Sequence, residues 1–243
     1  MTRFTVLPNA GAVAAATADR FIALARDAIE ERGIFRVALS GGGTPKEVYP
    51  LILDHDERDS VDWSRVEFFW GDERSVPPDH PESNFGVAYG MLISQLPGVR
   101  QDRIHRMPAE ASDLEAAALS YESELRLAFE ARAGEPPAFD LVWLGMGPDG
   151  HTASLFPGSA ALAEEGRWAV ANWAPEQETW RMTLTFPVLN AARAVLFVVT
   201  GEDKRPPLSE IREGSSDLPA ARVAGDQVEW IVDEAAAGEP TPA

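Results

Sequence analysis

One stretch constrains the fold of this chain more than any other, the twenty residues from 139 to 158, FDLVWLGMGPDGHTASLFPG. A mostly apolar run, residues 139–144, stops at a loop that contains three glycines within six residues. Such a run, bounded by glycine, is typical of a buried strand in a parallel sheet. The loop then carries Asp149 and His151, one of four histidines in 243 residues, and leads into a segment that we expect to be helical. Because α/β proteins bind ligands at the carboxyl ends of such strands, the stretch predicts a fold class and the place of a site.

A second buried-type strand, residues 34–39, ends in a loop of the same kind. The following segment, residues 44–47, reads TPKE, a capping box that predicts a helix with Thr44 at the N-cap. A strand, a glycine loop and a helix N-terminus in this order present free backbone N–H groups to an anion, whereas a plain tight turn normally needs only one glycine. The sequence therefore favours an anion site here, formed by Ser40, Gly41, Gly42, Gly43 and Thr44.

Charged residues follow a third strand, residues 66–70, where a solvated turn is the alternative to a site. Asp72 and Arg74 are the candidates for binding, and we expect Glu73 to pair with a nearby arginine. Position favours a site, because the carboxyl ends of parallel strands meet at one edge of a sheet. A helix is then predicted to begin at Ser83-Asn84.

The remaining segments alternate in the same way. Helical periodicity is clear over residues 10–32, where Gly33 ends the helix, and over residues 114–133. Because strands alternate with helices and no linker is apparent, we expect one α/β domain over residues 1–235, with a mostly parallel sheet covered by helices on both faces. Residues 236–243 are predicted to be a flexible tail. Further strands are expected at residues 104–107, 168–173, 182–186, 195–200 and 228–232.

Composition excludes several classes of function. Lysine and arginine total 21 against 39 aspartates and glutamates, a formal net charge of -18, which argues against nucleic acid and anionic membranes as partners. The absence of cysteine excludes disulfides and thiolate catalysis. No apolar run approaches the roughly 18 residues that a membrane span needs, so we expect a cytoplasmic protein.

Two kinds of cofactor site are poorly supported. Residues 145–150, GMGPDG, match the dinucleotide fingerprint, but Pro148 lacks an N–H group and Asp149 places negative charge where pyrophosphate would bind. The four histidines show none of the spacings that are typical of metal ligands, so no metal site is expected.

His151 is the candidate general base, since a histidine side chain titrates near neutral pH. Either Asp149 or Asp72 can orient its ring, and the alternative is that His151 only caps the following helix. The large aromatic residues nearby are expected to belong to the core and not to stack on a sugar: Trp70, Trp143 and Phe156.

Taken in order, these motifs resemble those of the 6-phosphogluconolactonases, in the glucosamine-6-phosphate isomerase/6-phosphogluconolactonase family. The resemblance spans residues 1–235, although the family more often has a Ser-Gly-Gly-Thr/Ser-Thr-Pro loop, from which Gly43 departs. It rests on Ser40-Gly-Gly-Gly-Thr-Pro45, Phe69-Trp-Gly-Asp-Glu-Arg74, Val76-Pro77, Ser83-Asn84, GMGPDGHTASLFP at residues 145–157, Arg181-Met-Thr-Leu184 and Gly201-Glu-Asp-Lys204.

The resemblance implies hydrolysis of 6-phospho-D-glucono-1,5-lactone, a step of the pentose phosphate pathway, with no metal and no organic cofactor. It implies a Rossmann-like sheet with a small appended β region, shared with glucosamine-6-phosphate deaminases and ribose-5-phosphate isomerases. A monomer is expected, with a weak dimer as the alternative. The implied catalytic residues are His151, Asp72 and Asp149. The implied substrate-binding residues are Ser40, Gly41, Gly42, Gly43, Thr44, Arg74, Asn84, Gly147, Arg181 and Lys204.

Two rival functions are retained as alternatives. Glucosamine-6-phosphate deaminases look similar but carry a glutamate five residues after the histidine, and here that position is Phe156. An isomerising deaminase without this carboxylate lacks one of its proton carriers, whereas lactone hydrolysis needs one base and charge stabilisation. The other rival is a catalytically silent module that binds sugar phosphates.

Overall fold

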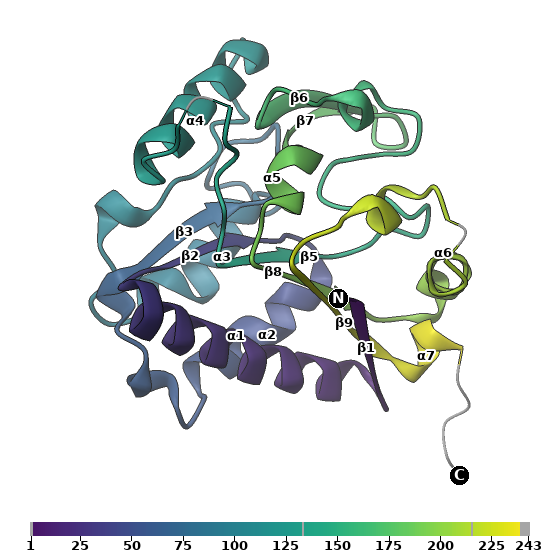
Figure 1. Cartoon of the computed structure of the whole chain (residues 1–243), viewed down its shortest axis with the longest axis horizontal. Coiled ribbons are helices and arrows are strands. Elements are labelled where there is room, and N and C mark those ends of the chain that lie inside the picture. The colour runs from purple at the N-terminus through teal and green to yellow at the C-terminus, as the bar shows by residue number, and fades with distance from the viewer. Residues whose placement is uncertain (1, 133, 215, 239–243) are drawn as a thin grey trace.

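The core of the molecule is a six-stranded sheet in the order β1-β9-β8-β5-β2-β3, in which neighbouring strands are all parallel (Figure 1). The structure is a computed structural model that describes residues 2–132, 134–214 and 216–238. The strands are β1 (Thr2–Leu7), β2 (Phe35–Leu39), β3 (Val66–Trp70), β4 (Asp72–Arg74), β5 (Leu141–Leu144), β6 (Ala169–Ala174), β7 (Thr179–Leu184), β8 (Ala194–Val199) and β9 (Gln227–Asp233). The helices are α1 (Ala10–Arg32), α2 (Gly43–Leu53), α3 (Asn84–Met91), α4 (Leu114–Ala128), α5 (Phe186–Asn190), α6 (Arg205–Arg212) and α7 (Glu234–Ala237).

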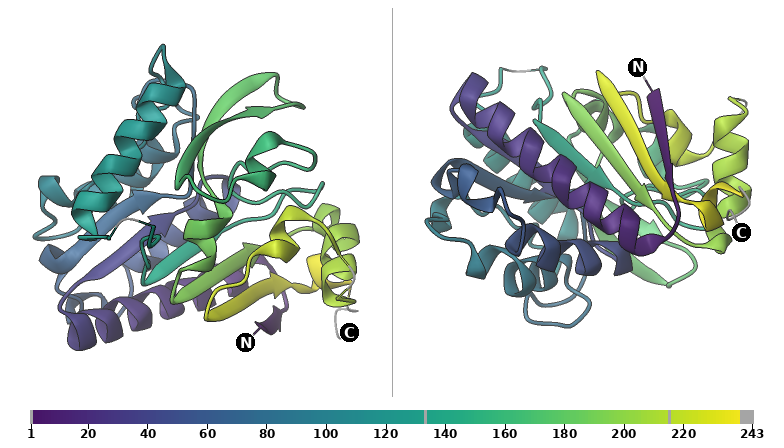
Figure 2. Two further views of the ribbon diagram at one scale, coloured as in Figure 1. Left: turned by 45° about the horizontal axis from the view of Figure 1, so that its top comes forward. Right: turned by 90° about the horizontal axis from the view of Figure 1, so that it is seen from below.

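Helices cover both faces of this sheet, as predicted. Successive side chains of a strand point to opposite faces, so Val37 and Leu39 pack with α1 and α2 while Ala38 packs on the other side. Figure 2 shows α1 crossing the whole sheet on one face. The bounds of α1 are those that the periodicity predicts, and Gly33 ends it with a φ of +76° and an N–H donated to the Ile29 carbonyl at 2.9 Å.

A second, three-stranded antiparallel sheet in the order β4-β7-β6 lies above the other face (Figure 1). The strands predicted at residues 168–173 and 182–186 are present but belong to this small sheet, which confirms the appended β region. Its register places Asp72 opposite Thr183 and Arg74 opposite Arg181. Directly opposed residues share a face, and residues two apart along a strand do too, so these four side chains point to one side.

The strand order places the site. β2 and β5 are neighbours at the centre of the sheet, yet the chain continues from β2 towards β3 on one side and from β5 towards β8 on the other. The loops that follow β2 and β5 therefore diverge. This is the topological switch point at which open α/β sheets bind ligands.

The structure corrects several expectations about elements. The helix expected directly after His151 is not present; Thr152 and Leu155 form an isolated antiparallel bridge there instead. Of the strand expected at residues 104–107, only a bridge between Ile104 and Phe68 is present.

Two further boundaries differ from the prediction. The helix predicted over residues 114–133 ends at Ala128, and a φ of +48° at Glu130 marks the turn beyond it. The tail boundary expected at 236 is too early, because α7 spans Glu234–Ala237 and buries Ala236. Residues 239–243 lie outside the described residues. Within the described part of the chain, no helix is long and apolar enough to cross a membrane.

Candidate active site

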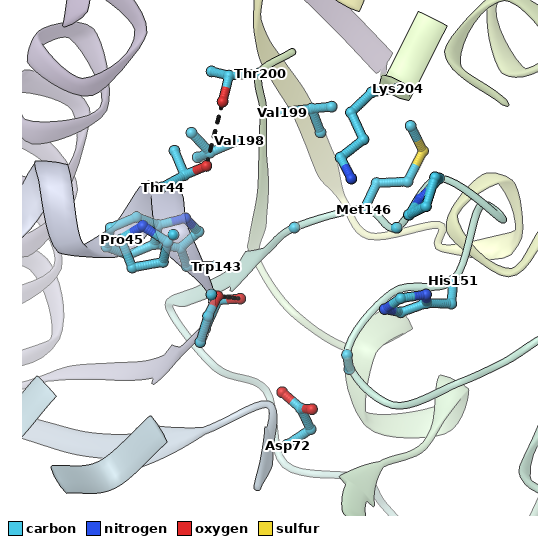
Figure 3. Close-up of a pocket in the computed structure, with 18 of the residues that line it drawn as sticks. Thr44, Pro45, Asp72, Trp143, Met146, His151, Val198, Val199, Thr200 and Lys204 are labelled. Atoms are coloured by element: carbon cyan, nitrogen blue, oxygen red, sulfur yellow. Dashed lines mark hydrogen bonds between the residues drawn. The ribbon is translucent and has the colours of Figure 1, made fainter. Parts of the chain in front are cut away.

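A cleft of about 280 Å³ lies at the carboxyl ends of β2 and β5. Figure 3 shows His151, Asp72 and Lys204 on three sides of the same open space. Two more predicted residues contact the lining from behind, Asp149 through His151 and Asn84 through Asp72. The lining includes Ser40, Gly41, Gly42, Gly43, Thr44, Asp72, Arg74, Gly147, His151 and Lys204.

The glycine loop, residues 40–43, forms one wall of the cleft. Gly42 has a φ of +100°, which glycine adopts without strain, and α2 begins directly after it at Gly43. The predicted N-cap at Thr44 is therefore wrong, because the consecutive glycines complete the turn early enough to place Thr44 inside the helix. Its Oγ1 lies 3.4 Å from Oγ1 of Thr200. With no side-chain cap on α2, the loop retains the unsatisfied N–H groups that suit an anion.

His151 forms the opposite wall, with Asp149 behind it. The His151 Nδ1 atom lies 2.6 Å from Asp149 Oδ1, and the same oxygen accepts the His151 backbone N–H at 3.1 Å. Burial raises the pKa of Asp149, but the hydrogen bonds from His151 outweigh it and hold the pKa below its usual range. The carboxylate is therefore ionised at neutral pH and fixes the imidazole ring in one orientation.

Glycines permit this arrangement. A Cβ atom on Gly147 would lie 2.1 Å from His151 Nδ1, so no other residue fits beneath the ring. Gly147 also donates its N–H to the His151 carbonyl at 2.9 Å, and Gly150 donates to the Gly147 carbonyl at 3.0 Å. The loop is thus a closed turn that carries the side chains of Pro148, Asp149 and His151.

Asp72 forms the floor between these walls. Its Oδ2 accepts the Ser154 hydroxyl at 2.5 Å, and its Oδ1 lies 3.3 Å from Nδ2 of Asn84. Asn84 Nδ2 also donates to the Asp72 backbone carbonyl at 2.8 Å. Of the two carboxylates that sequence reasoning left open as partners of the ring, Asp149 makes the hydrogen bond to His151 and Asp72 binds Ser154. Ser154 was missed as a site residue, because nothing in its spacing indicates contact with a residue 82 positions away.

Glu73 was also misjudged. The carboxylate does not pair with an arginine side chain; it accepts the backbone N–H groups of Arg74, Asn84 and Phe85, each at 2.8 Å, and the Ser83 hydroxyl at 3.1 Å. Burial raises the pKa of Glu73, and the backbone hydrogen bonds only partly offset this. Glu73 thereby ties β4 to the N-terminus of α3, which fixes its neighbours Asp72 and Arg74.

The three predicted cations differ in their surroundings. Lys204 lines the cleft and pairs with the exposed Asp203 at 2.7 Å. Arg74 lines the cleft too and donates from Nη1 to the Glu82 carbonyl at 2.9 Å. Arg181 lies opposite Arg74 in the small sheet, and burial, followed by the charge of Arg74, lowers its pKa. No carboxylate of the described residues lies within ion-pair distance of Arg181.

The aromatic residues belong to the core, as expected. Trp70 and Trp143 are fully buried, and Trp143 reaches the base of the cleft. Phe156 is buried with its ring centroid 4.7 Å from that of His151, so it packs beneath the imidazole. Among the residues that the structure describes, no group of three or more acidic or histidine side chains is arranged to hold a metal ion.

Known proteins resemble this chain in both sequence and structure. The family model of glucosamine-6-phosphate isomerases/6-phosphogluconolactonase matches residues 8–232. A 6-phosphogluconolactonase of Nostoc sp. is 39% identical over 239 residues, 96% of each chain. The structure of 6-phosphogluconolactonase from Trypanosoma cruzi superimposes with a TM-score of 0.87 at 27% identity, covering 100% of this chain and 98% of that one.

A monomeric glucosamine-6-phosphate deaminase shares the fold, with a TM-score of 0.80 at 18% identity over 97% of this chain and 99% of that one. The chain therefore belongs to the glucosamine-6-phosphate isomerase/6-phosphogluconolactonase family.

Proposed function

We propose that this chain hydrolyses 6-phospho-D-glucono-1,5-lactone to 6-phospho-D-gluconate, an ester hydrolysis of the pentose phosphate pathway. The observation that carries the proposal is the 2.6 Å hydrogen bond between His151 and Asp149 at the edge of the cleft. It occupies Nδ1 of the ring, while Nε2 has no hydrogen-bond partner among the described residues. The relatives at 39% and 27% identity are 6-phosphogluconolactonases, which supports the same reaction.

In this proposal His151 is the general base. Asp149 accepts the Nδ1–H, which leaves the lone pair on Nε2 to take a proton from water. The resulting hydroxide attacks the lactone carbonyl carbon, and the tetrahedral intermediate forms with its negative charge on the former carbonyl oxygen. Collapse breaks the bond between that carbon and the ring oxygen, and His151 returns its proton to this oxygen. One water is consumed, and an acid and an alcohol are formed.

The developing negative charge needs donors that are already in place. Backbone N–H groups of the glycine loop or a nearby cation are proposed to stabilise the oxyanion. The substrate phosphate is assigned to the same loop, with Lys204 and Arg74 as counter-charges and Arg181 behind Arg74. The absence of a carboxylate partner for Arg181 supports this assignment, because two adjacent arginines favour an anion between or beside them.

Asp72 is proposed to accept hydrogen bonds from sugar hydroxyls. An ionised carboxylate has about four acceptor positions, and Ser154 and Asn84 use two of them. Both hydrogen bonds that Asn84 Nδ2 donates go to Asp72, so we propose that Asn84 orients the Asp72 carboxylate. The substrate then meets Asp72 directly and Asn84 only through it.

The domain organisation, oligomeric state and location of the chain are also part of the proposal. Residues 1–235 are proposed to act as a single domain, as a monomer or a weak dimer, in the cytoplasm and without nucleic acid as a partner. No metal or organic cofactor is required by the steps above.

The rival deamination reaction is disfavoured by one observation. At the position where the deaminases carry a glutamate, Phe156 is buried against the His151 ring. A carboxylate there would have to be buried beside an aromatic core, and the proton relay for ring opening lacks its carrier.

The deciding experiment compares two reactions of the same purified chain. Freshly prepared 6-phosphogluconolactone should be hydrolysed far above its spontaneous rate, whereas glucosamine 6-phosphate should release no ammonia. A lactone rate equal to the spontaneous rate contradicts the proposal. Ammonia release in its place supports the deaminase. If the chain shows neither activity but binds 6-phosphogluconate, that result supports the silent module.

A further inference from the structure

The loop that carries His151 is supported from outside the cleft by a segment that the proposed reaction does not use. This segment includes the short 3-10 helix Pro219–Arg222 and the residue before it, Leu218. Ala220 donates its backbone N–H to the Gly150 carbonyl at 3.0 Å. Gly150 is the residue directly before His151, so this hydrogen bond holds the loop one residue away from the proposed general base.

The side chain of Leu218 lies against the same glycine. A Cβ atom on Gly150 would lie 2.7 Å from Leu218 Cδ1 and 2.9 Å from its Cβ and Cδ2. The Leu218 side chain thus occupies the volume that any other residue at 150 would need. Gly150 also has a φ of +76°, a conformation that glycine holds without strain. The turn is therefore shaped to accept Leu218.

Two packing contacts hold the His151 loop from opposite sides. On the cleft side, the imidazole lies directly over the Cα of Gly147. On the outer side, Leu218 fills the space against Gly150. A loop with neither contact would keep its hydrogen bonds but gain room to shift, and a shift of the ring misplaces Nε2.

We propose that Leu218 is a positioning residue for His151 and acts through its contact with Gly150. It touches neither the substrate nor the reacting atoms. The kinetic part of this inference rests on the proposed lactone hydrolysis, while its structural part does not.

The segment is itself anchored. Leu218 donates its N–H to the Ser216 hydroxyl at 3.2 Å, and that hydroxyl donates to Glu210 in α6 at 2.9 Å. Pro219 and Ala220 are buried. α6 begins directly after Lys204, the proposed counter-charge of the substrate phosphate (Figure 1). The chain that follows α6 therefore returns to the loop that carries His151. The backbone of Leu218 is therefore tied to α6 through Ser216.

The kinetic test is Leu218→Ala in the full chain. We expect kcat for the lactone to fall about tenfold with KM nearly unchanged, because a displacement well under 1 Å suffices for such a loss. Leu218→Met, which preserves volume, should retain nearly the wild-type kcat. Leu24→Ala is the matched control, a half-buried leucine of α1 on the other face of the sheet, and it should lower stability without lowering kcat.

A second readout does not depend on activity. NMR of the imidazole protons, with the His151 signals identified by His151→Ala, should show shifted His151 signals in Leu218→Ala and unchanged signals for the other three histidines. Leu218→Val, which removes one carbon, should give a smaller shift in the same direction and replaces the alanine variant if that variant does not fold. If the wild type proves to lack lactonase activity, the NMR shift alone decides.

The contact itself is tested by a double substitution. Gly150→Ala should impair kcat through its clash with Leu218, and adding Leu218→Ala should restore part of the loss. Unshifted His151 signals and a kcat within twofold of Leu24→Ala would overturn the inference, as would full additivity of the two substitutions at residues 150 and 218.

Discussion

His105 and His151 each bind a carboxylate, as His55 also does, but these two differ in how many ring nitrogens remain free. His105 uses both: Nδ1 lies 2.6 Å from Glu124 Oε1, and Nε2 lies 3.0 Å from Glu67 Oε1. His151 uses only Nδ1, against Asp149 at the same 2.6 Å. The side chain of His105 is 12% exposed, whereas that of His151 is 27% exposed and faces the cleft (Figure 3).

The two imidazole rings differ in their hydrogen-bond partners. Burial lowers the pKa of His105, but its two carboxylates outweigh burial and raise the pKa to about 9. It is therefore a charged link between β3 and α4, stacked on Phe69 at 4.4 Å. In His151, Nε2 has no hydrogen-bond partner among the described residues, and the proposed mechanism uses this nitrogen as the base. Both histidines bind a carboxylate, so that hydrogen bond does not by itself distinguish a proposed base from a structural ion pair.

The largest expected effect on kcat comes from substituting His151, with substitution of His105 as the comparison. His151→Asn should lower kcat for lactone hydrolysis about 10³-fold, since it removes the general base. His105→Gln should leave kcat within about twofold of the wild type, because the residue does not line the cleft. Initial rates with fresh lactone, corrected for spontaneous hydrolysis, measure both. Equal losses in the two variants would abolish the distinction.

Asp149→Asn should cost less, about 10²-fold in kcat with little change in KM. The amide retains the size of the carboxylate but loses the charge that stabilises the imidazolium, and it can favour the wrong ring tautomer. Asp102→Asn is the control, an exposed acid paired with Arg100 at 2.6 Å, and should behave as the wild type. A wild-type rate for Asp149→Asn would show that the ring is oriented by something else.

The stability contribution of His105 should depend on pH with a defined sign. Its folded-state pKa of about 9 is above the ordinary value of 6.5, so the contribution is complete below pH 6.5 and is lost as the pH rises through 9. Urea unfolding should show His105→Gln destabilised by about 2 kcal/mol at pH 6 and progressively less towards pH 10. A difference that stays constant over this range would mean that His105 is not held as a cation.

The smallest expected effect concerns the aromatic rings beneath the two histidines. Phe156→Leu should lower kcat about threefold, because the His151 ring loses part of its packing surface. Phe69→Leu, beneath His105, should lower the melting temperature and leave kcat unchanged. Kinetic and thermal measurements on the pair separate the roles. A loss of kcat in Phe69→Leu equal to that in Phe156→Leu would contradict them.

Much of the fold followed from local pattern. Helix α1 and the strands β2, β3 and β5 are bounded by signals that lie within a few residues of them, such as Gly33 and the loops at residues 40–43 and 145–150. The Thr44 cap failed for a local reason too, since Gly42 already turns the chain. Local pattern therefore predicted most of these boundaries but not the cap of α2.

The site was predictable only in part, because its contacts join distant segments. The sequence could nominate Asp72 and Asp149 as partners of His151 but could not choose between them. The choice depends on Ser154 reaching Asp72 at 2.5 Å, a contact between the segment after β5 and strand β4 of the small sheet. The role of Leu218 against Gly150 is hidden for the same reason.

Chemical rescue tests the central claim, that the open nitrogen of His151 is the base, most directly. His151→Gly should leave a space beside Asp149, and added imidazole should restore lactone hydrolysis in a saturable manner. The increase must exceed that which the same imidazole produces in enzyme-free solution and with an Asp149→Ala/His151→Gly double variant. An increase no larger than in enzyme-free solution would contradict the account.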